Sequence, residues 1–272
     1  DPSVDVSLMC DRALLALRSI KSGFDTRLAY YDDVLRASLL DEQQLVSDME
    51  AALESEQFVL YFQPQINYGN GTLTGAEALV RWRHPQRGLL PPADFITLFE
   101  QNGLITRLDK YVWERCCKYI RRWIDLFPWA TDFSVSVNVS RLDICDPQLC
   151  DTLKKIIRKY ELPVSALRLE ITESAYMESQ QQLIDTVEAL RKAGFTVEMD
   201  DFGSGYSSLN TLKDVAVDIL KLDMKFLSNC ADSARGGNIL CSVIRMAHWL
   251  RLPIIAEGVE TKAQADYLKS LG

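Results

Sequence analysis

Two adjacent carboxylates, Asp200 and Asp201, end a segment whose residues alternate in the manner of a β-strand. Val197 and Met199 share one side of this strand, and Asp200 lies on the other. A loop with glycines at both ends, residues 203–205, follows directly, and its backbone can turn tightly. Neighbouring carboxylates repel each other unless a cation lies between them. An isolated Asp-Asp pair is also typical of a solvated turn, so a metal site needs further groups that converge there.

Other predicted strands also end in an acid, an amide or a lysine. In a β/α barrel, inward side chains at the C-terminal ends of the strands meet in one pocket. Acids inside a strand are usually paired for structural reasons, but six polar residues from six strands favour a binding pocket. Five of them carry the oxygen donors that Mg²⁺ and Mn²⁺ prefer, and Asp201 can reach a second ion. The six residues are Glu77, Asn138, Glu170, Asp200, Lys221 and Glu257.

The chemistry that suits such a pocket is metal-assisted attack of water on a phosphodiester. Two divalent ions can polarise the phosphate, lower the pKa of a bridging water and stabilise the leaving oxygen. Lys221 offers a cation beside that water, or forms a structural salt bridge to Asp200 or Glu257. Glu257 can accept a proton or hold Lys221, and the sequence leaves both roles open. Arg81, four residues after Glu77, suits a phosphate, although it is also typical of a solvated surface.

Composition and charge argue against several other classes of protein. The chain has only two histidines, His84 and His248, whereas zinc hydrolases and Ser-His-Asp hydrolases need imidazole among their reacting groups. Seven cysteines without a Cys-x-x-Cys motif predict reduced thiols in a cytoplasmic protein. The formal net charge of −8 disfavours polymeric nucleic acid as a partner. A small anionic ligand stays compatible with this charge, because a metal ion or an arginine reverses the sign locally.

Strand and helix patterns alternate along most of the chain, which predicts an α/β fold with a mostly parallel sheet. We expect seven strands, and Asn70-Gly71 predicts a tight hairpin that makes one of them antiparallel. The length of 272 residues suits a TIM-like (β/α)8 barrel. Thr261 and Gln264 form a capping box that predicts the start of the last helix. Because the chain stops at Gly272, we expect an eighth strand to lie beyond this sequence.

The residues before the barrel form separate elements. An amphipathic helix is expected over 7–21, without further elements of its own domain around it. Residues 1–31 are therefore interpreted as the remnant of a preceding domain. A second helical pattern predicts a linker helix in residues 32–55. The barrel domain is expected to cover residues 56–272.

Six motifs resemble those of the EAL-domain cyclic di-GMP phosphodiesterases, in the family's order and spacing, over about residues 56–272. The resemblance implies a barrel with one antiparallel strand. It also implies hydrolysis of cyclic di-GMP to the linear dinucleotide pGpG with Mg²⁺ or Mn²⁺ as the cofactor. The motifs are Gly75-Ala-Glu-Ala-Leu-Val-Arg-Trp-Arg-His-Pro85, Ser136-Val-Asn-Val-Ser140, Leu169-Glu-Ile-Thr-Glu-Ser174, Asp200-Asp-Phe-Gly-Ser-Gly-Tyr-Ser-Ser-Leu209, Lys221-Leu-Asp223 and Ala256-Glu-Gly-Val-Glu-Thr261.

The resemblance also implies roles for matching residues. Lys221 and Glu257 would orient or activate the water. Glu173 would hold the Asp-Asp loop, which in the family is implicated in dimer contacts, so a homodimer is expected. The implied metal ligands are Glu77, Asn138, Glu170, Asp200 and Asp201. The implied substrate-binding residues are Gln63, Leu79, Arg81, Asp223 and Glu260.

Three features depart from the family or extend beyond it. Ser204 stands where the family usually has threonine, which keeps the hydroxyl. The family's Gln-Gly-Tyr segment after the last helix is absent. Residues 9–31 resemble the end of a GGDEF diguanylate cyclase domain, so we expect an upstream GGDEF or sensor domain in the parent protein. The cyclase signature itself is missing, so this chain is not expected to make cyclic di-GMP.

Three hypotheses about function follow. The first is an active phosphodiesterase, whose activity is lost in Glu77→Ala or Asp200→Asn. The second is a catalytically inactive receptor that binds cyclic di-GMP in the same pocket without turnover. The third is an unrelated barrel enzyme that uses Lys221 as a Schiff-base amine. Surrounding acids would raise the pKa of this lysine, which disfavours the third hypothesis.

Overall fold

The computed structural model describes residues 5–18, 28–175, 180–202, 212–223 and 234–271. The chain divides into two compact units, Asp1–Glu56 and Gln57–Gly272. The first unit contains the helices α1 (Val6–Arg18) and α2 (Asp33–Glu54), as predicted. The Asp32 carboxylate accepts a hydrogen bond from the Leu35 N–H at 2.8 Å, which caps the N-terminus of α2.

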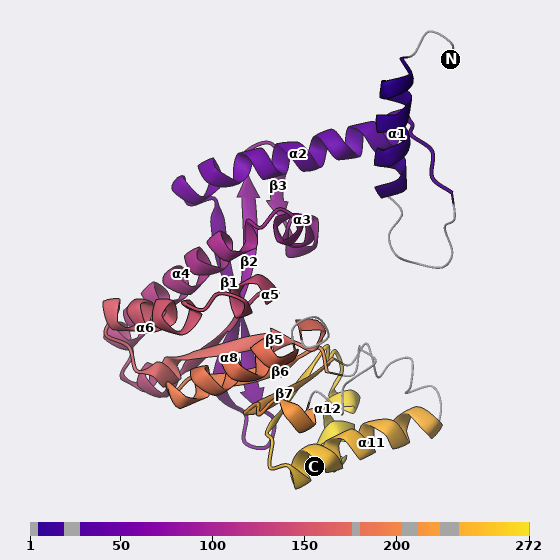
Figure 1. Cartoon of the computed structure of the whole chain (residues 1–272). Coiled ribbons are helices and arrows are strands. Elements are labelled where there is room, and N and C mark those ends of the chain that lie inside the picture. Colours follow the sequence, from indigo (N-terminus) through magenta and orange to yellow (C-terminus); the bar gives the residue numbers. More distant parts are fainter. Residues whose placement is uncertain (1–4, 19–27, 176–179, 203–211, 224–233, 272) are drawn as a thin grey trace. The chain divides into compact units, whose positions relative to one another are not determined.

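One mostly parallel sheet organises the second unit (Figure 1). The first strand runs antiparallel to the second, and each later pair along the sheet is parallel. This arrangement confirms the predicted α/β fold with one antiparallel strand. A further short strand, β3 (Gly88–Leu90), pairs with β2 and was not predicted. In spatial order the strands are β1 (Phe58–Asn67), β2 (Thr72–His84), β4 (Ser134–Asn138), β5 (Leu167–Thr172), β6 (Thr196–Asp200), β7 (Ile219–Asp223) and β8 (Ile254–Glu257).

The first hairpin and the last helix meet at the side of this sheet. Gly71 has a φ of 72°, the left-handed conformation that the predicted Asn70-Gly71 turn requires. Tyr68, in the same turn, donates a hydrogen bond from its hydroxyl to Asp266 of α12 (Lys262–Leu271) at 2.7 Å. The nitrogen of Lys269 lies 5.5 Å from the centre of the Tyr68 ring. The sheet therefore curls so that an element next to β8 reaches the β1–β2 turn.

The described helices alternate with the strands as predicted and differ from the prediction in details. The capping box of Thr261 and Gln264 is present at the start of α12. The dipeptide Asp146-Pro147 is the sequence pattern of an N-cap followed by the first helical residue and predicts a helix start there. The helix after β4 nevertheless begins at Leu149, and the Asp146 carboxylate accepts from the Gln148 N–H in the preceding turn. A short helix, α5, comes before it and was not predicted. The other helices that the structure describes in this unit are η1 (Pro92–Asp94), α3 (Ile96–Gln101), α4 (Ile105–Leu126), η2 (Pro128–Asp132), α5 (Arg141–Ile144), α6 (Leu149–Lys159), η3 (Val164–Ala166), α8 (Gln180–Lys192) and α11 (Ala234–Trp249).

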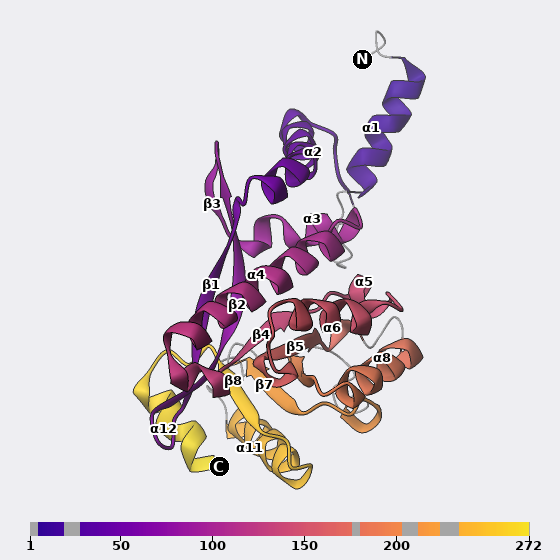
Figure 2. The same ribbon diagram turned by 90° about the vertical axis from the view of Figure 1, so that its left-hand side faces the viewer.

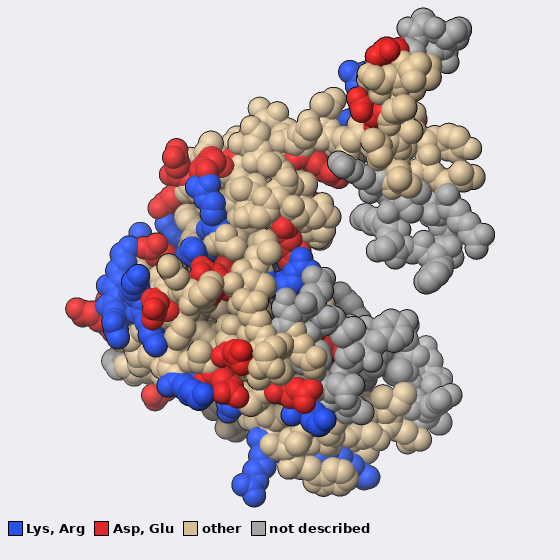
Figure 3. Space-filling view, viewed as in Figure 1, with Lys and Arg blue, Asp and Glu red and all other residues tan. Residues whose placement is uncertain are grey.

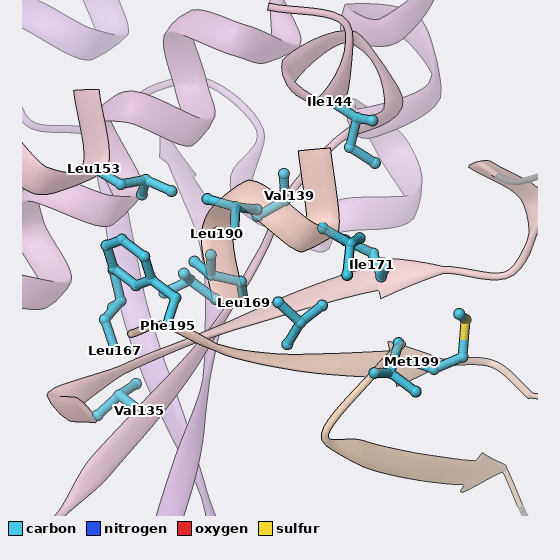
Figure 4. Packing of buried hydrophobic residues seen from close by; sticks show 14 of the residues in the cluster. Val135, Val139, Ile144, Leu153, Leu167, Leu169, Ile171, Leu190, Phe195 and Met199 are labelled. Carbon is cyan, nitrogen blue, oxygen red and sulfur yellow. The ribbon is translucent and has the colours of Figure 1, made fainter. Parts of the chain in front are cut away.

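The two faces of the parallel strands differ in chemistry. In β5, Leu167, Leu169 and Ile171 are buried in one apolar cluster with residues of α6 and α8, including Leu153 and Leu190 (Figure 4). Figure 2 shows α6 and α8 alongside β5. The alternate residues of the same strands point to the interior of the curled sheet, since successive side chains lie on opposite faces. The apolar face fixes the strands against the helices, and the interior face is free to carry polar groups.

Leu169→Ala is expected to destabilise the chain by about 2–5 kcal/mol, the range for a buried leucine truncated in a packed core. Leu169 is completely buried in the apolar cluster. The unfolding temperature of Leu169→Ala is expected to be roughly 4–20 °C below that of the wild type, given the size of the domain. Leu126→Ala is the matched control, because Leu126 is 58% exposed. Equal unfolding temperatures for the two variants would contradict this assignment of the core.

Candidate active site

Lys221 of β7 lies among four carboxylates that come from four other strands. The distances from its Nζ are 3.2 Å to Glu77 Oε2, 2.8 Å to Glu170 Oε1, 3.2 Å to Asp200 Oδ1 and 2.7 Å to Glu257 Oε1. Each of these residues is in the strand phase that faces the interior of the sheet. The structure therefore brings together five of the six residues that the strand pattern places in one pocket.

Burial and charge keep Lys221 protonated. The side chains of Lys221 and Glu170 have exposed fractions of only 1% and 0%. Burial alone would lower the pKa of Lys221, but the four surrounding carboxylates outweigh it and raise this pKa well above the ordinary value. Burial also raises the pKa of Glu170, although Lys221 opposes the rise. Lys221 is thus a fixed positive charge and not a neutral amine, which argues against a Schiff-base role.

Asn138 and Gln63 lie beside this cluster by strand register. Asn138, the last residue of β4, is paired with Glu170 of β5. Gln63 of β1 is paired with Glu77 of β2. Paired residues of adjacent strands have their side chains on the same face of the sheet. Both amides therefore face the interior next to a carboxylate of the cluster.

Asp201 and Asp223 add two carboxylates close to the same place. Asp201 has a φ of 54°, a left-handed conformation that is uncommon for a residue other than glycine. Burial raises the pKa of Asp201, and the nearby charges of Asp200, Asp223 and Glu257 raise it further. Asp223 is paired with Glu257 across β7 and β8. The Asp-Asp pair at the end of β6 therefore has both of its carboxylates near the cluster.

The remaining predicted residues lie around this pocket to different extents. Leu79 and Arg81 continue the Glu77 face of β2, and the Arg81 guanidinium lies 5.8 Å from the centre of the Tyr61 ring. Glu173 is buried, and its N–H donates to the carbonyl of Asp200 at 3.3 Å. The Glu260 N–H donates to the Gln264 side chain. Residues 203–209 of the predicted loop motif lie outside the described residues.

The oxygen donors of this site fit a divalent cation. Four carboxylates face one ammonium, so the cluster keeps a surplus of negative charge. Neither carboxylate oxygen of Glu170 accepts a well-aligned hydrogen bond within the described part of the chain, although the residue is buried. Across those residues, no group of three or more His, Cys, Asp or Glu side chains is arranged to hold a metal ion, and the four carboxylates instead converge on Lys221. Hard oxygen donors in excess over one ammonium, with Glu170 Oε2 buried and without a hydrogen-bond partner among the described residues, are the chemistry that Mg²⁺ or Mn²⁺ suits.

A second polar layer lies two residues earlier along the strands and was not among the predicted site residues. Glu198 of β6 is completely buried and accepts a hydrogen bond from Ser136 of β4 at 2.8 Å. Its other oxygen is 3.3 Å from Arg168 Nη1 of β5. Arg168 also reaches Gln65 at 3.5 Å. The alternation along the strand already places Glu198 on the same face as Asp200, so its inward direction could have been predicted. The partners of Glu198 could not, because they depend on how three strands pair.

The outer surface shows a mixture of charges. Lys and Arg side chains gather over α4 and α6 on the face seen in Figure 3, with Asp and Glu among them. Lys159 pairs with Glu114, and Arg121 pairs with Asp125 at 2.6 Å. These acids interrupt the basic area. None of the described helices is long and apolar enough to span a lipid bilayer.

A lysine held by carboxylates at the C-terminal ends of parallel strands defines an α/β protein of the barrel type with a polar interior site. The EAL domain family model matches residues 46–272, and the chain belongs to this family. The match begins inside α2, before the boundary between the two units.

Three curated relatives cover most of this chain. The bifunctional diguanylate cyclase/cyclic di-GMP phosphodiesterase MucR of Pseudomonas aeruginosa is 36% identical over 243 residues, 89% of this chain and 35% of MucR. The cyclic di-GMP phosphodiesterase NbdA of the same species is 35% identical over 98% of this chain and 35% of NbdA. The cyclic di-GMP phosphodiesterase PdeR of Escherichia coli is 29% identical over 98% of this chain and 40% of PdeR. The chain thus spans only about a third of the length of these relatives.

Solved structures with the same fold include complexes with nucleotides. The PaMucR phosphodiesterase in complex with c-di-GMP is 38% identical, with a TM-score of 0.78 over 84% of this chain and 92% of that chain. The EAL enzyme Bd1971 in its cAMP- and cyclic-di-GMP-bound form is 29% identical, with a TM-score of 0.82 over 100% of this chain and 71% of that chain. These similarities confirm the predicted barrel-type fold.

Proposed function

We propose that this chain hydrolyses cyclic di-GMP to linear pGpG in a reaction that needs Mg²⁺ or Mn²⁺. The observation that carries the proposal is the cluster of four carboxylates around Lys221 at the C-terminal ends of the strands. The names of the relatives MucR, NbdA and PdeR support the substrate and the reaction. The c-di-GMP complex of PaMucR supports binding of this nucleotide by the same fold.

The proposed metal ligands are residues of the inner face of the sheet and of the Asp-Asp pair. Two bound divalent metal ions would lower the pKa of a water molecule and neutralise the charge of the phosphate. Bulk solvent is excluded from the Lys221 side of the carboxylate cluster, because Lys221 and Glu170 are buried. The ligands of this proposal are Glu77, Asn138, Glu170, Asp200 and Asp201.

Lys221 and Glu257 have different roles in this proposal. Lys221 stays protonated, so it orients the attacking water and stabilises negative charge. Glu257 is 32% exposed at its side chain, which is more than Glu77 or Asp200, and it lies 2.7 Å from the Lys221 nitrogen. Burial raises the pKa of Glu257, and Lys221 opposes this rise. A carboxylate with a raised pKa at the edge of the cluster is suited to accept the proton of the water.

The proposed substrate contacts lie on β1, on β2, at the last residue of β7 and in the segment that follows β8. Gln63 faces the interior next to Glu77 and can bind a polar edge of the dinucleotide. Arg81 brings a guanidinium that suits a phosphate. The other contacts of the proposal are Leu79, Asp223 and Glu260, with Glu173 as the residue that holds the Asp-Asp loop.

The proposal is tested by product analysis of cyclic di-GMP incubated with the chain, with Mn²⁺ and with a chelator. We expect linear pGpG with Mn²⁺ only, and no product from Asp200→Asn. Asp218→Asn is a matched control, because Asp218 pairs with Arg191 at the opposite ends of the strands from the cluster. Tight binding of cyclic di-GMP without product after long incubation would instead identify a receptor.

Three broader expectations accompany this function. The parent protein carries an upstream GGDEF or sensor domain, the chain forms a homodimer, and it works in the cytoplasm. The first two expectations come from the sequence resemblance, and the third comes from the scattered cysteines. Size-exclusion chromatography with light scattering, with and without cyclic di-GMP, tests the dimer.

A further inference from the structure

The second polar layer has one member two residues away from each of four residues of the candidate site. Two residues along a strand bring a side chain back to the same face, roughly 6–7 Å away. The layer therefore lies directly beneath the site, on the inner face of the same strands. On each strand the layer residue and the site residue are, respectively, Gln65 and Gln63 of β1, Ser136 and Asn138 of β4, Arg168 and Glu170 of β5, and Glu198 and Asp200 of β6.

Glu198 joins three of these strands through its side chain. One carboxylate oxygen accepts a hydrogen bond from the Ser136 hydroxyl at 2.8 Å, and the other accepts one from Arg168 Nη1 at 3.3 Å. In the sheet, β5 lies between β4 and β6. The bond from Ser136 to Glu198 therefore passes over β5 and fixes the distance between the two strands on either side of it.

Arg168 gives this layer a positive charge of its own. Glu198 is paired with Glu170 across β5 and β6, so its charge lies next to the most buried carboxylate of the site. Like charges on paired residues destabilise a sheet. Lys221 is already shared by the four carboxylates of the site. Because Arg168 balances Glu198 within the layer, the site keeps Lys221 and its surplus of carboxylate oxygens to itself.

Gln65 extends the layer to β1 and over β2. Its Oε1 accepts a hydrogen bond from Arg168 Nη1 at 3.5 Å. Gly75 of β2, two residues before Glu77, leaves room for the Gln65 side chain. A Cβ at Gly75 would lie 3.0 Å from Gln65 Oε1 and 2.8 Å from the carbonyl oxygen of Ser134. The layer thus connects β1, β2, β4, β5 and β6, which follow one another in the sheet.

We propose that Arg168 and Glu198 are positioning residues, which fix the spacing of the ends of β4, β5 and β6 beneath the site. These strand ends carry three of the proposed metal ligands, so the inference rests on the proposed function. Arg168 and Glu198 are not ligands themselves, and each acts through the residue two positions later on its own strand. A buried ion pair adds little stability compared with apolar residues of similar size, because both charges lose their hydration. The contribution of this pair is therefore expected in the affinity for the divalent ion.

An apolar-layer variant, with Ser136→Ala, Arg168→Met and Glu198→Met combined, separates position from stability. It removes the hydroxyl, the guanidinium and the carboxylate together, so no buried charge loses its partner. Its unfolding temperature without metal is expected to stay within roughly 4 °C of the wild type. Its dissociation constant for Mn²⁺, measured by titration calorimetry without substrate, is expected to rise by about 10- to 100-fold, the usual effect of losing groups that orient a metal ligand.

Two single variants show whether position or charge is responsible. Glu198→Gln removes the charge and keeps both contacts, since its amide oxygen accepts from Arg168 and its amide nitrogen donates to the Ser136 hydroxyl. This variant is expected to bind Mn²⁺ as the wild type does, and a rise equal to that of the apolar-layer variant would overturn the positioning role. Ser136→Ala breaks the link to β4 with a small change and is expected to raise the dissociation constant to an intermediate value. If the apolar-layer variant does not fold, an unchanged constant in Ser136→Ala overturns the proposal.

Arg121→Met is the matched control, because the pair of Arg121 and Asp125, at 2.6 Å, lies on the outer surface of α4. It is expected to keep the stability and the Mn²⁺ affinity of the wild type. An apolar-layer variant with unchanged Mn²⁺ affinity, whether or not it is less stable, would give Arg168 and Glu198 a purely structural role. If the wild type neither binds Mn²⁺ nor hydrolyses cyclic di-GMP, the proposed function fails and this inference fails with it. A wild type that does both, beside an apolar-layer variant with the same Mn²⁺ affinity, overturns this inference alone.

Discussion

Lys221→Met is expected to destabilise the metal-free chain by about 3–5 kcal/mol, the usual cost of removing one partner from a buried ion pair. The methionine fills a similar volume but leaves the carboxylates of four strands without their shared ammonium. Burial already raises the pKa of Glu170 and Glu257, and without Lys221 nothing in the cluster opposes that rise. Thermal unfolding in a metal-free buffer measures the effect, and a decrease of roughly 6–20 °C is expected for a domain of this size.

Added Mn²⁺ is expected to restore part of this stability in Lys221→Met, because a divalent ion neutralises the same carboxylates. Hydrolysis is not expected to return, since the orienting charge beside the water is missing. Lys262→Met is the control: its ion pair with Asp266, at 2.7 Å, lies on the surface, where such pairs contribute little. If Lys221→Met and Lys262→Met unfold at the same temperature, Lys221 does not hold the cluster together.

The convergence of the cluster could be predicted because two simple rules act together. Alternation along each strand puts Glu170 and Asp200 on the face opposite the apolar residues, and parallel strands bring their C-terminal ends to one edge. The side chains that pack on the helices, such as Leu169 and Met199, make that phase unambiguous. The inward direction of the polar residues therefore follows from the sequence.

The exact partner of each polar group could not be predicted, because it depends on distances between strands. Lys221 was expected either beside the water or in a salt bridge to Asp200 or Glu257, and it contacts these two and also Glu77 and Glu170. The buried pair of Arg168 and Glu198 depends on the register of β5 and β6.

The shortest helix and the shortest strand were also not predicted from the sequence. α5 has only four residues, and its capping box uses Asp143 where the expected pattern has Glu or Gln. β3 has three residues, too few for the alternation of side chains to be recognised.

Glu170→Gln is expected to separate the stability of the fold from its activity. The change keeps the shape of the side chain and removes one negative charge that repels Glu77 and Asp200. Lys221 keeps three other carboxylates, and the amide oxygen of glutamine can keep the 2.8 Å contact that Glu170 Oε1 makes with the Lys221 nitrogen. The metal-free variant should therefore unfold at the temperature of the wild type or above it. In the same variant, the rise in unfolding temperature on adding Mn²⁺ should disappear, and hydrolysis should fall at least about 100-fold.

Glu188→Gln makes the same chemical change on the surface of α8, where Glu188 pairs with the exposed Lys192, and should alter neither stability nor hydrolysis. The comparison matters because a buried carboxylate kept only for structure would behave in the opposite way, with a loss of stability and an unchanged response to Mn²⁺. A carboxylate kept for a cation costs stability when the cation is absent, since its charge is buried without enough partners. An unchanged Mn²⁺ response in Glu170→Gln would remove this residue from the metal site, and a lower unfolding temperature without metal would make it a structural partner of Lys221.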